Sequence, residues 1–397
     1  MLLYICTCFF VLKFLGGVQL ARHITQLKVN GYRSLRNFEI EDLADINILL
    51  GDNNCGKTSV LEVLNTFSAI NQTTKWLNTN ITRRSIRGNL NPCYDLECLF
   101  DINNTENEIE ISFKDSKNQI NNVIFSYSSS PESLMMRDIK GIDKLSYRRL
   151  YNNIRYKNIG DSISQDTKQE IDDIIINAIH SYTRIKINDT KPFEDNFYDF
   201  SPVIMGGGDK ISFFNTIFHY PYKYIREEIN LSDIIENKKL YNDLISVLQQ
   251  FDKEITQIFA DQESDKVIYK IASSSNNKSL PISIFGDGLK LAISVFADIP
   301  RAQNGLLLID EFDSSLHTSQ ISKILSAMII MCKKFNIQLF LTTHNKEAID
   351  KILECCKDFL NDVRIISMTK NEKRTYSQIL DGQLAWELRF QNDAELR

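Results

Sequence analysis

The stretch that decides the fold is Gly51-Asp52-Asn53-Asn54-Cys55-Gly56-Lys57-Thr58-Ser59. It fits the pattern G-x-x-x-x-G-K-[ST], which marks a loop whose backbone N–H groups surround phosphate oxygens. An apolar run at 46–50 precedes it as a strand, and residues 58–67 follow with the apolar spacing of a helix. Such a loop directs its N–H groups and the helix dipole at a bound anion. The alternative is a glycine-containing turn without a ligand, but the context favours a nucleotide-binding loop.

Two side chains of this loop are predicted to act on the nucleotide and its cation. Lys57 would reach the β- and γ-phosphates, and Thr58 would place its hydroxyl on Mg²⁺, which bridges the same oxygens and offsets their charge. We therefore predict ATP and Mg²⁺ as the bound species.

Length and composition fit a globular protein of two or three domains. The chain has 397 residues, of which 43% are hydrophobic and 24% charged. Its net charge is −5 and its pI about 5.7, so any contact with DNA would need a local basic patch. The eight cysteines show no paired C-x-x-C and no neighbouring histidines at zinc-ligand spacing. Reduced thiols and a cytoplasmic location are therefore expected.

Residues 1–22 form an apolar N-terminal extension that Lys13 interrupts. The run is short for a membrane helix containing a charge, and it lacks the positive charge that opens a secretory signal. We do not expect a membrane association. A signal, an anchor and an over-long start all remain open for this segment.

The rest of the chain divides into three predicted parts. Residues 23–130 carry the loop and strands expected at 24–29, 38–40, 46–50, 95–100, 108–113 and 122–127. Residues 131–265 are predicted to be a mainly helical insertion, with helices over 166–182 and 237–259, and the glycine triplet 206–208 is predicted to be a flexible connection. Residues 266–397 complete the domain that the insertion interrupts.

Two further apolar runs end in polar residues that suit phosphate chemistry. Residues 306–309 lead into Asp310-Glu311, and residues 337–341 lead into Thr342-Thr343-His344. Runs of this kind suit buried parallel strands, and the helical pattern between 318 and 335 supplies the crossover. Because the carboxyl ends of parallel strands meet at one edge of a sheet, the loop, the acidic pair and the histidine are predicted to converge.

The three polar residues are predicted to have distinct roles. Asp310 would hold Mg²⁺, Glu311 would polarise the attacking water, and His344 would contact the γ-phosphate and respond to its loss. An acidic pair that caps a strand and a structural histidine are the alternatives, and the presence of Lys57 favours the catalytic interpretation.

These segments resemble a known family, the ABC-type ATPase heads. Residues 51–59, 306–317 and 341–344 look like its Walker A, Walker B with D-loop, and switch-histidine segments, in a class that includes RecF, the structural-maintenance-of-chromosomes proteins and the OLD proteins. The OLD-like branch is most similar, through residues 29–35, Gly51-Asp52-Asn53-Asn54, Leu316-His317 and 285–290 in place of the ABC signature. The resemblance covers residues 24–67 and about 240–350.

The resemblance implies an α/β fold: a P-loop NTPase of the ABC-ATPase head type, with a mixed sheet and a largely helical insertion. It also implies a homodimer that holds each ATP between the loop of one head and the signature of the other. Gly286, Asp287 and Gly288 would present N–H groups to the partner's γ-phosphate, with Asp287 or Ser283 adding side-chain contacts. Transporters and chromosome proteins have Ser where the chain has Gly286, and a plain helix-start turn is the alternative.

Full OLD proteins also carry a Toprim nuclease, which we do not expect in the residues that follow His344. We therefore predict an ATPase subunit that controls a separately encoded effector, a nuclease or toxin, in defence against phage or in DNA metabolism. A RecF-like clamp that closes on DNA with incidental turnover is the main alternative. The ATPase subunit of a membrane transporter is a third, which the signature and Leu316-His317 disfavour.

Overall fold

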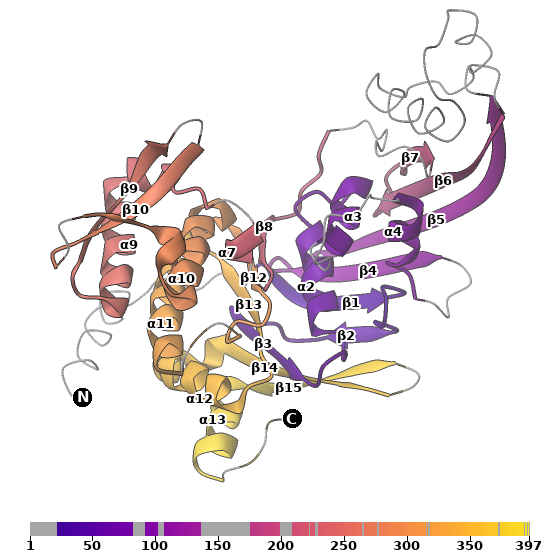
Figure 1. Cartoon of the computed structure of the whole chain (residues 1–397). Helices are drawn as coiled ribbons and strands as arrows, with labels where there is room; N and C mark the ends of the chain where they lie inside the picture. The colour runs from indigo at the N-terminus through magenta and orange to yellow at the C-terminus, as the bar shows by residue number, and fades with distance from the viewer. Residues whose placement is uncertain are drawn as a thin grey trace, which may run out of the picture.

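The computed structural model describes residues 22–81, 92–101, 107–135, 175–198, 209–221, 223–226, 229–263, 266–275, 278–314, 316, 318–371, 374–392, 394 and 396. Residues 1–21, the part 166–174 of the helix expected over 166–182, and the glycine triplet 206–208 lie outside this described part. The described elements form three sheets and the helices that cover them (Figure 1).

The central sheet positions the residues of the candidate site. Its order is β15-β14-β3-β13-β12-β8, formed by β3 (Ile46–Gly51), β8 (Asn215–His219), β12 (Gly305–Ile309), β13 (Gln338–Thr342), β14 (Val363–Lys370) and β15 (Thr375–Asp381). All neighbours are parallel except β14 and β15. The predicted strands at 46–50, 306–309 and 337–341 are confirmed, and so is the predicted crossover helix, α11 (Thr318–Phe335).

Helices cover both faces of this sheet because its strands are apolar on both sides. On β12, Leu307 and Ile309 belong to one core cluster, and Leu306 and Leu308 belong to the other. The first core packs under α10 (Asp287–Asp298), α11, α12 (Lys346–Cys355) and α13 (Gly382–Phe390), and the second under α2 (Lys57–Thr66). The carboxyl ends of the strands therefore form the edge at which polar side chains collect.

A second sheet is antiparallel throughout, with the order β2-β1-β4-β5-β6-β7. Its strands are β1 (Ile24–Asn30), β2 (Phe38–Ile40), β4 (Glu108–Asp115), β5 (Ile120–Met135), β6 (Ile175–Ile187) and β7 (Phe193–Tyr198), and α3 (Thr73–Ile81) and α4 (Pro92–Glu97) lie beside it. This sheet shares a hydrophobic core with α2, the helix that follows the loop 51–59 (Figure 1).

The third sheet, β11-β10-β9, packs with α9 next to α10 and α11 (Figure 1). Its elements and the remaining short ones are α7 (Lys223–Arg226), α8 (Ser232–Glu236), α9 (Lys238–Phe251), β9 (Ile255–Glu263), β10 (Lys266–Ser273), β11 (Leu280–Pro281), and the 3-10 helices η2 (Ile282–Ile284), η3 (Ile299–Ala302) and η4 (Lys357–Asp362). Across the described residues, no helix combines the length and the hydropathy needed to cross a bilayer.

Three predictions of local structure were wrong, each for a physical reason. The strand expected at 95–100 begins within helix α4, where Pro92 occupies the first turn and its fixed φ suits a helix start. From Ile175 onward the helix expected over 166–182 is strand β6, because β5 supplies a long antiparallel partner for its β-branched residues. The helix expected over 237–259 ends at Phe251, since Asp252 is extended and β9 then pairs with β10.

These corrections change the character of the middle segment. The described part of 131–265 contains β6, β7, β8 and β9 as well as α7, α8 and α9, so these described residues are mixed rather than mainly helical. The α/β class and the mixed central sheet are confirmed.

Candidate nucleotide-binding site

The loop between β3 and α2 owes its shape to glycines. Gly51 has φ +138°, and a Cβ there would lie 2.2 Å from the Met368 carbonyl oxygen of β14. Gly56 has φ +104° and stands immediately before α2. A residue with a side chain is strained at such φ values, so the backbone can turn this tightly only with glycine. The N-terminus of α2 therefore opens onto the edge of the sheet.

Lys57 lies across the loop. Its Nζ donates to the carbonyl oxygens of Gly51 at 2.8 Å and Asp52 at 2.9 Å, and it lies 3.9 Å from the Cys55 sulfur. The side chain is almost wholly buried. Its charge is thus held over the loop by oxygen acceptors that phosphate oxygens can replace.

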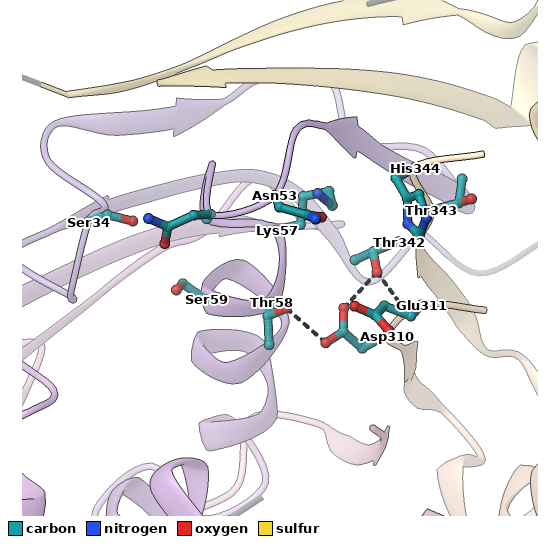
Figure 2. Close-up of a pocket in the computed structure, with 12 residues that line it drawn as sticks. Ser34, Asn53, Lys57, Thr58, Ser59, Asp310, Glu311, Thr342, Thr343 and His344 are labelled. Atoms are coloured by element: carbon teal, nitrogen blue, oxygen red, sulfur yellow. Dashed lines mark hydrogen bonds between the residues drawn. The ribbon is translucent and has the colours of Figure 1, made fainter. Parts of the chain in front are cut away.

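Asp310 joins the loop helix to the neighbouring strands. Thr58 Oγ1 donates to its Oδ2 at 2.8 Å, and Thr342 Oγ1 donates to its Oδ1 at 2.6 Å (Figure 2). The first bond connects residues 252 positions apart in the sequence. The predicted convergence of the loop and the acidic pair is therefore present in the structure.

Glu311 occupies an uncommon backbone conformation, with φ +47°. Its N–H donates to Thr342 Oγ1 at 2.8 Å, and the next N–H, that of Phe312, donates to the Thr342 carbonyl at 3.1 Å. Partial burial raises the pKa of the Glu311 carboxyl, and the charge of Asp310 raises it further, while His344 acts in the opposite direction. Burial and a like charge both favour the protonated form, which leaves this carboxylate readier to accept a proton.

A cavity of about 250 Å³ contains the predicted residues from all three segments (Figure 2). It is lined by Ser34, Asn53, Asn54, Gly56, Lys57, Thr58, Ser59, Asp310, Glu311, Thr342, Thr343 and His344. Gly51, Asp52 and Cys55 belong to the same loop but do not line the cavity. No role was predicted for Ser34, Thr342 or Thr343 from the sequence. The two threonines stand in the run that identified His344, so their place before it was the available signal.

The signature-like residues Gly286, Asp287 and Gly288 do not line this cavity. Gly286 precedes α10 and is exposed, with nothing within 4 Å of a Cβ built there. Gly288 is buried, and a Cβ there would lie 2.6 Å from the Gln320 side-chain oxygen, so this glycine lets α10 approach α11 closely. His317 lies outside the described residues.

Behind the acidic pair, β8 ends in a buried polar cluster. The His219 carbonyl accepts the Asp310 N–H at 2.9 Å, and His219 Nε2 lies 2.9 Å from Ser294 Oγ of α10. Lys223 Nζ donates to Asp298 at 2.7 Å beside them. Burial, aided by the charge of Lys223, lowers the pKa of His219 to about 3. A neutral imidazole therefore links the strand next to β12 with α10.

The residues present fit a bound Mg²⁺. This cation prefers oxygen ligands, commonly one or two carboxylates with waters and substrate phosphates. Thr58 Oγ1 and the Asp310 carboxylate supply such oxygens side by side at the cavity. When bound, Mg²⁺ offsets the charge of the β- and γ-phosphates.

This fold and this site together define a P-loop ATPase. The sequence matches the family described as "AAA domain, putative AbiEii toxin, Type IV TA system" over residues 46–350. The match spans well over half of the chain, and the chain belongs to this family.

Two curated proteins are similar in sequence. An "ATP/GTP phosphatase" of Helicobacter pylori is 21% identical over 397 residues, which covers 94% of this chain and 99% of that protein. The "Uncharacterized protein MJECL11" of Methanocaldococcus jannaschii is 30% identical over 112 residues, covering 28% of this chain and 98% of that protein.

Among solved structures, an Smc head bound to the C-terminal winged-helix domain of ScpA has a TM-score of 0.48 at 11% identity, covering 91% of this chain and 99% of that one. The SMC head domain from Thermotoga maritima has a TM-score of 0.41 at 11% identity, covering 90% and 98%. Scores at this level do not bear on function.

Proposed function

We propose that the loop 51–59, Asp310, Glu311 and His344 bind and hydrolyse ATP with Mg²⁺. The observation that carries this assignment is the hydrogen bond from Thr58 to Asp310, which joins the loop helix to the acidic pair across 252 sequence positions. Lys57 neutralises the β- and γ-phosphates, and Thr58 and Asp310 hold the cation. We further propose that 23–130 and 266–397 form the head around the segment 131–265, which contributes β8 to the central sheet.

Glu311 is the general base in this proposal. Its carboxylate lines the cavity beside Asp310, and its raised pKa favours acceptance of a proton from the attacking water. His344 lines the same cavity, where it contacts the γ-phosphate and responds to its departure.

Replacement of Glu311 by Gln tests this assignment. We expect Glu311→Gln to lower the steady-state rate of ATP hydrolysis by roughly 10²-fold or more, because the base is lost, while nucleotide is still retained. Lys57→Ala is the matched variant, in which nucleotide binding itself is expected to fail. Turnover at the wild-type rate in Glu311→Gln would remove Glu311 from catalysis.

The active form that we propose is a homodimer closed by ATP. Gly286 and Asp287 are exposed at the start of α10, outside the cavity of their own chain, and the neighbouring Ile284 is 61% exposed. The start of a helix has backbone N–H groups without intrahelical partners, which suit the γ-phosphate end of a nucleotide carried by a second copy, and the exposed Ile284 suits an apolar contact with that copy.

Light scattering on Glu311→Gln tests the dimer. With Mg²⁺ and ATP the molar mass should double, and adding Gly286→Arg to this variant should keep it monomeric. Open space around Gly286 lets the arginine fit the single chain, so thermal unfolding should be unchanged. A molar mass that does not change on addition of ATP would argue against this dimer. So would a Gly286→Arg protein that still dimerises.

We also propose that the chain is an OLD-like or RecF-like ATPase subunit whose nucleotide state controls an effector, a nuclease or a toxin, in phage defence or DNA metabolism. The match to a family whose description names a toxin and a TA system supports a link with an effector. Co-purification from the native host with ATP, and separately with ADP, tests this role. A partner bound equally in both states would contradict nucleotide control.

A further inference from the structure

We propose that Thr342 is a positioning residue that holds the metal-binding carboxylate and the catalytic glutamate in one fixed arrangement. This inference rests on the proposed roles of Asp310 and Glu311. Thr342 is the last residue of β13, the strand between β3 and β12, and none of its surface is exposed.

One side chain makes both polar contacts. The Thr342 hydroxyl donates its only proton to Asp310 Oδ1 at 2.6 Å and accepts the Glu311 N–H at 2.8 Å (Figure 2). A hydroxyl has one donor and two acceptor positions, so both bonds can exist together and the direction of each is fixed. The Thr342 carbonyl adds a third bond, from the Phe312 N–H at 3.1 Å.

The bond to Asp310 determines which oxygen faces the loop. With Oδ1 held by Thr342, Oδ2 points to Thr58 Oγ1 at 2.8 Å, where the two oxygens assigned to Mg²⁺ stand side by side. Without the bond, the carboxylate can rotate about its side-chain torsions and lose this orientation. Hydrogen bonds to a charged group are also stronger than those between neutral groups.

The bond to Glu311 supports a strained backbone. A residue other than glycine at φ +47° persists only where surrounding contacts hold it. Thr342 supplies two such contacts, one from its hydroxyl to Glu311 and one from its carbonyl to Phe312. The position of Glu311 therefore depends on the same residue that orients Asp310.

Its neighbour Thr343 makes a different contact. Thr343 Oγ1 donates to Asp313 Oδ1 at 2.6 Å and accepts the Asn345 N–H at 3.1 Å. Of these two threonines, only Thr342 is hydrogen-bonded to both Asp310 and Glu311 in the described part of the chain.

The test is Thr342→Val, which keeps the shape of the side chain and removes the hydroxyl. Binding of a fluorescent ATP analogue is titrated with the full chain, first in EDTA and then against rising Mg²⁺. In EDTA the affinity should stay within about twofold of wild type, because Lys57 and the loop are intact. The Mg²⁺ concentration for half-maximal tightening should rise by roughly tenfold or more, as for loss of a hydrogen bond to a charged group.

Three further proteins separate positioning from folding. Thr342→Ser retains the hydroxyl and should restore the wild-type Mg²⁺ curve. Thr216→Val removes a buried threonine hydroxyl from β8, away from the cavity, and should leave that curve unchanged. Thr342→Val combined with Asp310→Asn should shift the curve no further than Asp310→Asn alone, because coupled residues are not additive. Thr342→Ala replaces the valine variant should that protein fail to fold.

The outcomes distinguish the two proposals. A wild-type protein that binds no nucleotide at any Mg²⁺ concentration contradicts the proposed function itself. A wild-type protein that tightens with Mg²⁺, together with a Thr342→Val curve that superimposes on it, contradicts the role of Thr342 alone. If the Mg²⁺ curve shifted equally in Thr342→Val and Thr216→Val, the effect would come from a general loss of stability. That result would overturn the proposal.

Discussion

At the scale of single residues, the site combines one strained position with one bridging side chain. Glu311 has a left-handed backbone, and Thr342 bonds both its N–H and the neighbouring carboxylate of Asp310. The convergence of the lysine loop, the acidic pair and the histidine on one cavity could be predicted, because these residue types at strand ends indicate phosphate chemistry. The threonines could not, since a hydroxyl at a strand end is common and its partners are set only by the fold.

The raised pKa of Glu311 leads to a pH prediction. As a base, Glu311 acts when deprotonated, so the acid limb of kcat should lie above the ordinary glutamate value of 4.5. Asp313 also raises this pKa, and Asp313→Asn should therefore move the limb to lower pH. Steady-state ATP hydrolysis between pH 4 and pH 8 measures both. An acid limb that stays in place, or that moves upward in Asp313→Asn, would contradict this electrostatic account.

At the scale of elements, β8 and α10 are joined through a buried neutral histidine. His219 ends the strand next to β12, and its ring meets Ser294 on α10. Strand β8 was not predicted, because a five-residue strand within the segment 131–265 has little pattern of its own. The helix expected from Ile175 onward failed for a related reason, since isoleucines at helical spacing also suit a long strand with a distant partner.

The lowered pKa of His219 should make stability depend on pH. The unfolded chain binds a proton near pH 6.5, whereas the folded chain binds it only near pH 3. The stabilisation that the neutral His219 gives to the folded chain is therefore complete above pH 6.5. It is lost as the pH falls from 6.5 toward 3, by about 1.4 kcal/mol per pH unit. We expect wild type to lose roughly 2 kcal/mol more than His219→Gln between pH 7.5 and pH 5. Urea unfolding at both pH values measures this.

A matched variant tests whether the loss of any polar side chain from β8 changes the pH dependence of stability. Thr216→Val lies on the same strand, removes a hydroxyl and carries no titrating group, so it should keep the wild-type slope of unfolding free energy against pH. Equal slopes for wild type and His219→Gln would show that His219 titrates alike in the folded and unfolded chain.

At the scale of the whole molecule, two hydrophobic cores share one sheet. Leu307 and Leu308 are adjacent on β12, are fully buried and belong to opposite cores. The sequence indicated the α/β class and the parallel strands, because long apolar runs suit burial on both faces. It could not show that the antiparallel sheet shares its core with α2, since that contact joins segments far apart in the chain.

The shared sheet predicts cooperative unfolding. Leu307→Ala and Leu308→Ala should each lower the free energy of unfolding by about 2–5 kcal/mol, because each leaves a cavity in a packed core. Calorimetry should show a single transition moving to lower temperature in both proteins, since each core is bounded by the same strand. Two separated transitions in either variant would show that the cores unfold independently.

The close packing of Gly51 against Met368 has a consequence for folding during translation. Strand β3 leaves the ribosome early, but both of its sheet neighbours, β13 and β14, are translated some three hundred residues later. Sequence-distant pairing of this kind slows folding, because a large loop must close before any contact rewards it. The lysine loop of a nascent chain therefore lacks its flanking strands until residues 338–370 have been made, and the candidate nucleotide site can form only after that point.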